Sequence, residues 1–130
     1  MNDSPRQAPN RPVLQPGPDH PISVTPTGSR VLVKVGDEVV ADSAKALTLQ
    51  EANYPACQYV PLADVNPELL RPSSTTSYCP YKGDCSYYSL ATADGEITDA
   101  IWTYREPFAA LGRIAGHVAF YQNKVTITVE

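Results

Sequence analysis

The residues best suited to chemistry gather in the stretch 76–85 (TSYCPYKGDC), which holds two of the three cysteines, two tyrosines and a lysine. Lys82 is the only basic residue between Arg71 and Arg105. Its ammonium group, three residues after Cys79, would favour the thiolate form of that cysteine, and the thiolate is the nucleophile. Beside phenol groups, the same ammonium can instead hold a carboxylate or a phosphate as a point charge. The stretch predicts either a reactive cysteine or a ligand-binding lysine.

Aromatic and acidic side chains elsewhere in the chain would complete such a site. Four of the eight tyrosines fall between residues 78 and 88. Neighbouring strand residues face opposite ways, so only one of Tyr87 and Tyr88 can line a given pocket. Glu51 can pair with Lys82 or act as an acid/base group. The candidate catalytic residues are Cys79, Lys82 and Glu51, and the candidate ligand contacts are Tyr78, Tyr81, Tyr54, Trp102, Tyr104, His20 and His117.

Each of these residues also has a purely structural role open to it. Free cysteine is often buried as a small hydrophobic residue, and tyrosines pack well on sheets. Lys82, next to Asp84, has the setting of a solvated turn residue. His117 begins an apolar segment, which is typical of a buried, hydrogen-bonded histidine, and His20 can anchor the start of the domain. Either histidine is also a candidate base for a Cys-His pair.

A metal site is not predicted. Structural zinc sites use closely spaced cysteine pairs, whereas five residues, including Pro80, separate Cys79 from Cys85. The chain contains no dinucleotide-binding glycine motif, P-loop, nucleophile elbow or HExxH motif. No cofactor can be named from the sequence.

Length and charge limit the classes of protein and of partner. The chain has 130 residues, which suits one domain, and a formal net charge of -4 from ten basic and fourteen acidic residues. Nucleic-acid or anionic-membrane binding is not expected, because these partners need clustered Lys and Arg. No stretch approaches the ~20 apolar residues of a membrane span. Three cysteines without an export signal predict reduced thiols and a cytoplasmic location.

The first 18 residues carry five of the thirteen prolines and predict a flexible tail, with the domain proper over residues 19–130. Alternating apolar residues predict strands near 22–24, over 30–35 and 38–42, and near 46–49, 58–60, 86–92, 96–104, 116–121 and 124–129. Three hairpin turns are predicted, at Gly36-Asp37, Asp94-Gly95 and Gln122-Asn123. In the last strand, Val125, Ile127 and Val129 would face inward.

A short helix is predicted over residues 61–72, with Asn66 as cap, Pro67 at the first helical position and Pro72 at the end. Residues 106–115 predict a further helical turn or two. The roughly eight strands and local hairpins favour a mainly β class. The expected architecture is a single compact antiparallel domain, either a folded-over sheet or sandwich or a partly open barrel.

Several ordered elements of the chain carry a family resemblance. They are Asp19-His20-Pro21-Ile22, the segment 39–43 (VVADS), Glu51 with Tyr54-Pro55, Tyr59 with Pro61 and Asp64-Val65, the core 79–83 (CPYKG), 100–104 (AIWTY) and 114–121 (IAGHVAFY). In these the chain resembles the DUF427 family, small bacterial and fungal proteins of unknown function, over about residues 19–130.

The resemblance implies a compact, mostly β domain and little about its chemistry. It points to His20, Glu51, Tyr78, Cys79, Lys82, Trp102 and His117 as family-type positions, and Cys85 is not among them. A nucleotidyltransferase-like label accompanies the family. Enzymes of that kind hold magnesium between paired carboxylates, but Asp94 lies in a turn and Glu96 and Asp99 point to opposite faces of one strand.

The leading hypothesis is a cytoplasmic β domain that binds a small polar or anionic ligand in an aromatic pocket around the segment 79–83. One alternative is an enzyme with Cys79 or Lys82 as nucleophile. Another is a protein-interaction module that binds a peptide on a sheet edge. The sequence does not decide whether the protein is an enzyme.

Overall fold

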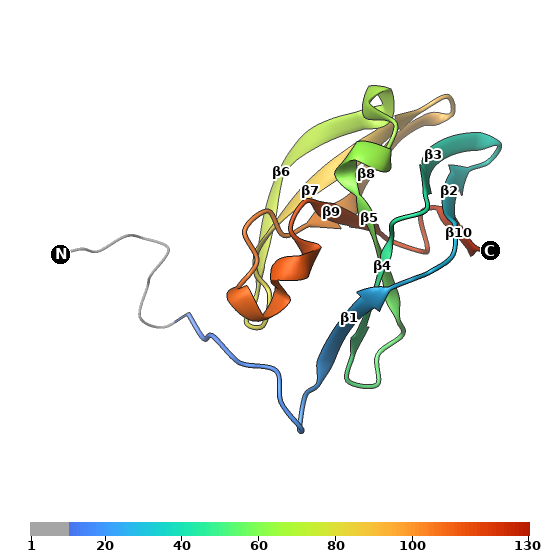
Figure 1. Ribbon diagram of the computed structural model, residues 1–130. Coiled ribbons are helices and arrows are strands. Elements are labelled where there is room, and N and C mark those ends of the chain that lie inside the picture. Colours follow the sequence, from blue (N-terminus) through green and yellow to red (C-terminus); the bar gives the residue numbers. More distant parts are fainter. Residues whose placement is uncertain (1–10) are drawn as a thin grey trace.

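Two antiparallel sheets account for the ten strands of the computed structural model, which describes residues 11–130 (Figure 1). The larger sheet has the order β1 (Ile22–Pro26), β4 (Leu47–Glu51), β5 (Cys57–Pro61), β9 (His117–Phe120), β8 (Gly95–Thr103), β7 (Gly83–Thr92), β6 (Leu70–Cys79). The smaller has the order β10 (Thr126–Val129), β2 (Val31–Val35), β3 (Glu38–Ser43). Three 3₁₀ segments complete the described elements: η2 (Leu62–Asp64), η3 (Pro67–Leu69) and η4 (Ala109–Ile114). Neither sheet closes into a barrel, and the predicted mainly β class is confirmed.

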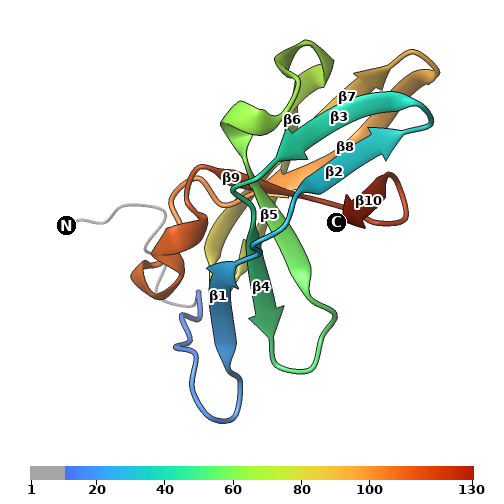
Figure 2. The same cartoon turned by 45° about the vertical axis from the view of Figure 1, so that its right-hand side comes forward.

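Two of the three predicted hairpins are present, and glycine makes both turns. Gly36 has a φ of 58° between β2 and β3, and Gly95 has a φ of 121° where the turn after β7 enters β8. Positive φ is accessible to glycine because it lacks a Cβ atom. The backbone N–H of Ala93, in the β7–β8 turn, donates to Glu38 Oε1 at 3.0 Å. This bond ties the two hairpins together where they lie side by side (Figure 2).

The third predicted hairpin is wrong. β9 pairs with β5 and β8, whereas β10 crosses to the other sheet and pairs with β2, with Ile127 opposite Val33. A tight turn after β9, in which the N–H of Lys124 donates to the carbonyl of Tyr121, redirects the chain. Alternation predicts that a segment is a strand but not which strand it pairs with. The inward face is also shorter than predicted, because Val129 is exposed.

The predicted helix over 61–72 is wrong as well. The segment forms two single turns, η2 and η3, and the second has the predicted cap, with Asn66 Oδ1 accepting from the N–H of Glu68 at 3.1 Å. Leu70 already begins β6, an edge strand. Pro72 is tolerated there because an edge strand leaves one row of backbone groups unpaired.

The β6–β7 hairpin places the chemically richest stretch at a hairpin tip. β7 begins at Gly83 rather than at residue 86, and Cys79 pairs with Gly83 across the turn. Residues 80–82 form that turn. Downstream, the helical turns predicted within 106–115 are present as η4, which is 3₁₀.

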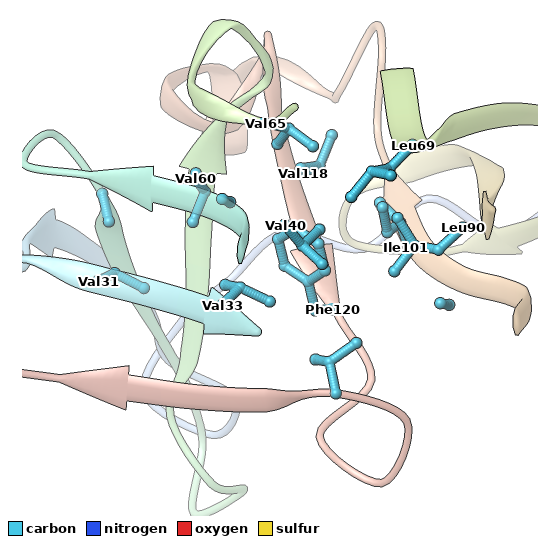
Figure 3. Packing of buried hydrophobic residues seen from close by; sticks show 14 residues of the cluster. Val31, Val33, Val40, Val60, Val65, Leu69, Leu90, Ile101, Val118 and Phe120 are labelled. Carbon is cyan, nitrogen blue, oxygen red and sulfur yellow. The ribbon is translucent and has the colours of Figure 1, made fainter. Parts of the chain in front are cut away.

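The main core lies between the two sheets (Figure 3). Valines of the smaller sheet meet apolar side chains of the larger one, with Val65 and Leu69 closing one side (Figure 3). The best buried members are Val31, Val33, Val40, Val60, Leu90, Ile101, Val118 and Phe120, each at most 2% exposed. Burial of this apolar surface is the main stabilising contribution to the fold.

A second buried cluster covers the opposite face of the larger sheet. Strand alternation sends Tyr59 to this face and Val60 to the intersheet core. Tyr87 and Tyr88 are separated in the same way, so their predicted opposite orientation is confirmed. Leu111 and Ile114 of η4 pack into this second cluster. It is richer in aromatic residues than the intersheet core, and the candidate site lies within it.

The predicted tail falls partly outside the described residues, since residues 1–10 are not among them. Arg11, Pro12 and Leu14 contact the β6–β7 hairpin, where the N–H of Leu14 donates to the carbonyl of Pro80 at 3.0 Å. Gly17 and His20 then form an isolated β-bridge before β1. Within residues 11–130, none of the helical segments has the length and apolar character that spanning a membrane requires.

The intersheet core makes a first prediction, based on a matched pair of valines. Val33 is fully buried and Val39, in the adjacent strand, is 43% exposed. Val33→Ala should lower the free energy of unfolding by about 2 kcal/mol, because it removes buried methyl groups and leaves a cavity. Val39→Ala should change it by less than about 0.5 kcal/mol. Urea unfolding followed by circular dichroism measures both, and equal losses would contradict the described β2–β3 orientation.

Candidate functional site

A buried ion pair between Lys82 and Glu51 is the centre of the candidate site. Lys82 lies in the β6–β7 turn, where its carbonyl accepts from the N–H of Phe108 at 2.9 Å. Glu51 is the last residue of β4. Lys82 Nζ lies 2.6 Å from Glu51 Oε1, and the two side chains are only 8% and 17% exposed. A buried ammonium requires such a partner, because removing an unpaired charge from water costs several kcal/mol.

His20 occupies the other oxygen of the same carboxylate. Its Nε2 lies 2.8 Å from Glu51 Oε2. The ring of Tyr81 stacks on the His20 imidazole, with centroids 4.1 Å apart and planes within 7°. Both oxygens of Glu51 are therefore engaged, one by Lys82 and one by His20, and the imidazole is fixed from behind by a phenol ring.

This arrangement lowers the pKa of Glu51. Burial, the largest single effect, acts to raise it, but the hydrogen bonds from Lys82 and His20 and their positive charges together outweigh burial. Glu51 is therefore a carboxylate at neutral pH and a weak proton acceptor. Its role in this geometry is to hold Lys82 and His20.

A cavity of about 210 Å³ opens beside the ion pair, on the aromatic face of the larger sheet. Trp102 is one of the residues that line it. Its Nε1 donates to the Tyr59 hydroxyl at 3.1 Å, and its ring centre lies 4.6 Å from that of Tyr121. The Lys82 ammonium lies 6.0 Å from the centre of the Tyr104 ring. The lining residues are Leu49, Glu51, Tyr54, Pro55, Cys57, Tyr59, Lys82, Cys85, Tyr87, Trp102, Tyr104 and Tyr121.

Burial keeps the Cys57 thiol and several phenols of this cavity protonated. It raises the pKa of the Cys57 thiol to about 11 and that of the Tyr121 phenol to about 12. Burial also raises the pKa of Tyr59 and Tyr104. At neutral pH the phenols are therefore hydrogen-bond donors, and Cys57 is a thiol rather than a nucleophilic thiolate.

The structure brings five of the ten predicted site residues to one cavity: Lys82, Glu51, Tyr54, Trp102 and Tyr104. Three more lie directly behind it. Cys79 Sγ is 3.8 Å from Lys82 Nζ, and His20 and Tyr81 form the stack against Glu51.

Two predicted site residues lie elsewhere. The Tyr78 hydroxyl donates to the carbonyl of Pro12 at 2.6 Å, so this ring faces the N-terminal segment. The His117 ring places Nδ1 2.9 Å from the carbonyl oxygen of Ala115, at the start of β9. Neither residue lines the cavity.

The main lining residues missed by sequence reasoning are Cys57, Tyr59, Cys85, Tyr87 and Tyr121. Alternation along β7 relates Cys85 to Tyr87, so one strand face carries both. Cys57 and Tyr59 are related in the same way on β5. Joining these faces into one wall required the order β5-β9-β8-β7, and the chain does not show that order locally.

No metal site is evident within residues 11–130, where no group of three or more His, Cys, Asp or Glu side chains is arranged to hold an ion. Backbone strain does occur beside the ion pair. Ala52, which follows Glu51, has a φ of 48°, and its N–H donates to the carbonyl of Pro21 at 2.7 Å. Side chains rarely adopt this conformation, which costs about 1–2 kcal/mol. The turn after β4 is thus held by its surroundings.

The ion pair makes a pH-dependent prediction. The folded pKa of Glu51 lies below its ordinary value of 4.5, so its stabilising contribution is present above about pH 4.5 and is lost as the pH falls through the folded pKa. Glu51→Gln should cost about 2 kcal/mol of unfolding free energy at pH 7. The difference from wild type should shrink below pH 4.5. Urea unfolding between pH 7 and pH 3 measures it.

The exposed Glu68 supplies the control for this experiment. Glu68→Gln should leave the unfolding free energy within about 0.5 kcal/mol of wild type at neutral pH. A difference between Glu51→Gln and wild type that stays constant from pH 7 to pH 3 would show that the Glu51 carboxylate is not the stabilising group.

Comparison with known proteins agrees with the resemblance noted in the sequence. A family model described as "Domain of unknown function (DUF427)" matches residues 23–130. A search of the curated proteins found no match. The matched range contains the Lys82–Glu51 pair and the whole cavity wall, while His20 and the segment that contacts the hairpin tip precede it. With most of its length matched by this model, the chain belongs to the DUF427 family.

Proposed function

We propose that this domain binds a small polar or anionic molecule in the cavity beside Lys82, and that it does so in the cytoplasm. The observation that carries the proposal is a buried ammonium placed at the wall of an aromatic cavity. Ligand sites of this kind combine apolar and aromatic walls with a few fixed polar groups. Three free cysteines support the cytoplasmic location.

The polar groups of the cavity favour an anion or a hydrogen-bond acceptor. An ammonium group has three N–H donors, and the contacts of Lys82 Nζ within the described residues are Glu51 Oε1 at 2.6 Å and Cys79 Sγ at 3.8 Å. The Tyr59 hydroxyl accepts from Trp102 and keeps its own proton to donate. The one carboxylate of the wall, Glu51, has both oxygens engaged. A ligand oxygen entering the cavity would therefore meet donors.

The cavity volume limits the size of the ligand. At about 210 Å³ it is smaller than the roughly 300–1,000 Å³ of pockets for drug-sized molecules, and larger than the ~150 Å³ engineered cavity that holds benzene. A molecule of about one ring with a carboxylate or phosphate oxygen fits this range. A nucleotide is larger. Asp94, Glu96 and Asp99, considered above for the nucleotidyltransferase-like label, are not among the lining residues.

The test is native mass spectrometry of protein purified gently from its own host. A small molecule should co-purify with wild type and be lost when Lys82 is replaced. The informative variant is the double substitution Lys82→Met with Glu51→Gln, since removing both partners avoids leaving a buried charge unpaired. Lys45→Met, at an exposed lysine, is the control and should retain the molecule. Retention in the double variant would contradict the proposal.

A second candidate function rests on a separate contact, the 3.8 Å between Cys79 Sγ and Lys82 Nζ. An ammonium beside a thiol stabilises the thiolate, and a stabilised thiolate is the usual form of a nucleophilic cysteine. On this candidate the domain is an enzyme with Cys79 as its nucleophile.

The relative alkylation rates of the cysteines in this protein distinguish this candidate from the binding proposal. With iodoacetamide at pH 7, Cys79 should react at least about tenfold faster than Cys57, whose thiol is half-buried, as that of Cys79 is, but has a pKa raised to about 11. Lys82→Met should slow Cys79, and it should not speed Cys57, because the Lys82 charge acts to lower the pKa of that thiol too. Peptide mapping by mass spectrometry separates the sites, with Cys85, only 2% exposed, as an internal reference. Equal rates at Cys79 and Cys57 would exclude the nucleophile.

A further inference from the structure

The outer side of the β6–β7 hairpin tip holds an extended segment of the chain's own N-terminal region. Three groups form this tip surface: the Tyr78 ring and hydroxyl, the Pro80 carbonyl and the Asp84 carboxylate. The Tyr78 hydroxyl donates to the carbonyl of Pro12 at 2.6 Å, and the N–H of Leu14 donates to the carbonyl of Pro80 at 3.0 Å. Four consecutive residues, 11–14, thus dock through backbone as well as side-chain groups.

Arg11 makes two contacts with the same surface. Its guanidinium carbon lies 3.8 Å from the centre of the Tyr78 ring, and Nη2 lies 2.5 Å from Asp84 Oδ1. A planar guanidinium suits both contacts, since it stacks on an aromatic face and pairs with a carboxylate at its edge. Phe108 supports the Tyr78 ring edge-on, with centroids 6.3 Å apart. The tip surface therefore contacts the arginine side chain as well as the backbone of the docked segment.

The docked segment has the chemistry of a proline-rich ligand. Pro12 and Pro16 fix their own backbone angles and disfavour the helical region for Arg11 and Gln15. Residues 12–16 accordingly belong to no helix or strand. A tyrosine hydroxyl that donates to a proline carbonyl, beside an aromatic ring, is typical of surfaces that bind extended proline-containing peptides.

The segment is held without burial of its apolar side chains. Val13 and Leu14 are 55% and 46% exposed. The Asp84 side chain, which pairs with Arg11, is 61% exposed. Contacts of this kind, at a surface and without apolar burial, belong to the least stable parts of a fold. We therefore expect the segment to leave the tip surface at a lower cost in free energy than unfolding of the domain.

The surface and its occupant belong to different parts of the chain. Tyr78, Pro80 and Asp84 lie within the range matched by the family model, residues 23–130, whereas residues 11–14 precede it. The contacts thus join a family domain to a segment outside the matched range.

We propose that the tip surface is a docking site for an extended peptide that contains arginine followed by proline, and that residues 11–14 are its intramolecular occupant. This inference is independent of the small-molecule cavity. It concerns the outer side of the hairpin whose turn carries Lys82, so docking and the ion pair share one short structural element.

The test uses the full chain with its own segment undocked. Arg11→Ala with Leu14→Pro removes the guanidinium and the N–H that donates to Pro80, and both positions lie outside the core. The ¹⁵N-labelled double variant is titrated with an acetylated peptide of residues 11–18 (RPVLQPGP). Saturable shifts of the Tyr78 and Asp84 amides are expected at millimolar peptide. Wild type should need about twofold more peptide, because the tethered segment competes at an effective millimolar concentration, comparable with the millimolar dissociation constant expected for the peptide.

Matched variants assign the binding to the tip surface. In the undocked background, Tyr78→Phe or Asp84→Asn should weaken peptide binding at least about fivefold, as expected for loss of one hydrogen-bonding partner. Asp94→Asn, at the exposed turn of the other hairpin, should not. A peptide with alanine in place of its arginine should bind more weakly than wild-type peptide binds the Asp84→Asn variant, because it loses the contact with the Tyr78 ring as well.

Two results would overturn the inference. Absence of saturable shifts in the undocked variant would show that the surface has no affinity for such a peptide. Equal binding by wild type and the undocked variant would show that residues 11–14 do not occupy the surface. Amide hydrogen exchange gives an independent measurement without added peptide, since the Leu14 N–H should exchange at least about fivefold faster in Asp84→Asn than in wild type.

Discussion

A buried lysine must meet its carboxylate, and this constraint shapes the whole larger sheet. Glu51 ends β4, the second strand in the order, while Lys82 lies in the turn between the last two strands. Four strand spacings of about 4.8 Å would separate β4 from β7 by about 19 Å in a flat sheet. The 2.6 Å contact between the two side chains therefore requires a strongly curled sheet whose two ends approach each other. The aromatic cavity is the space that this curl encloses.

The two faces of the larger sheet carry different kinds of side chain. One face packs its aliphatic residues against the smaller sheet, and the other carries phenols, thiols and Trp102 around the cavity. Strand alternation makes the division possible with neighbouring residues, as with Tyr59 and Val60. The cavity wall also contributes to stability, because Leu49, Tyr59 and Cys85 are buried members of the second cluster.

Local patterns predict nine of the ten strands, two hairpins and the neighbourhood of Lys82 and Glu51, because alternation and glycine turns act over a few residues. Local patterns do not predict the features that depend on pairing between strands far apart in the sequence. Pro72 and Pro80 interrupt the strand pattern of β6, so the sequence does not predict this strand. Tyr78 and Cys79 are therefore predicted for one site, although adjacent residues of a strand face opposite ways. The lining by Tyr59, Tyr87 and Tyr121 follows from the strand order, and no local signal encodes it.

The position of the ion pair also bears on how the molecule folds. Glu51 and Lys82 are 31 residues apart in sequence, and strands β5, β9 and β8 lie between β4 and β7 in the sheet, so we expect the two side chains to meet only after these strands have paired. In partly assembled chains both charges remain solvated, so their attraction cannot speed the search for the native topology. Interactions that form after the folding barrier act by slowing unfolding. We therefore expect the ion pair to slow unfolding and so to lengthen the lifetime of the folded state, without speeding folding.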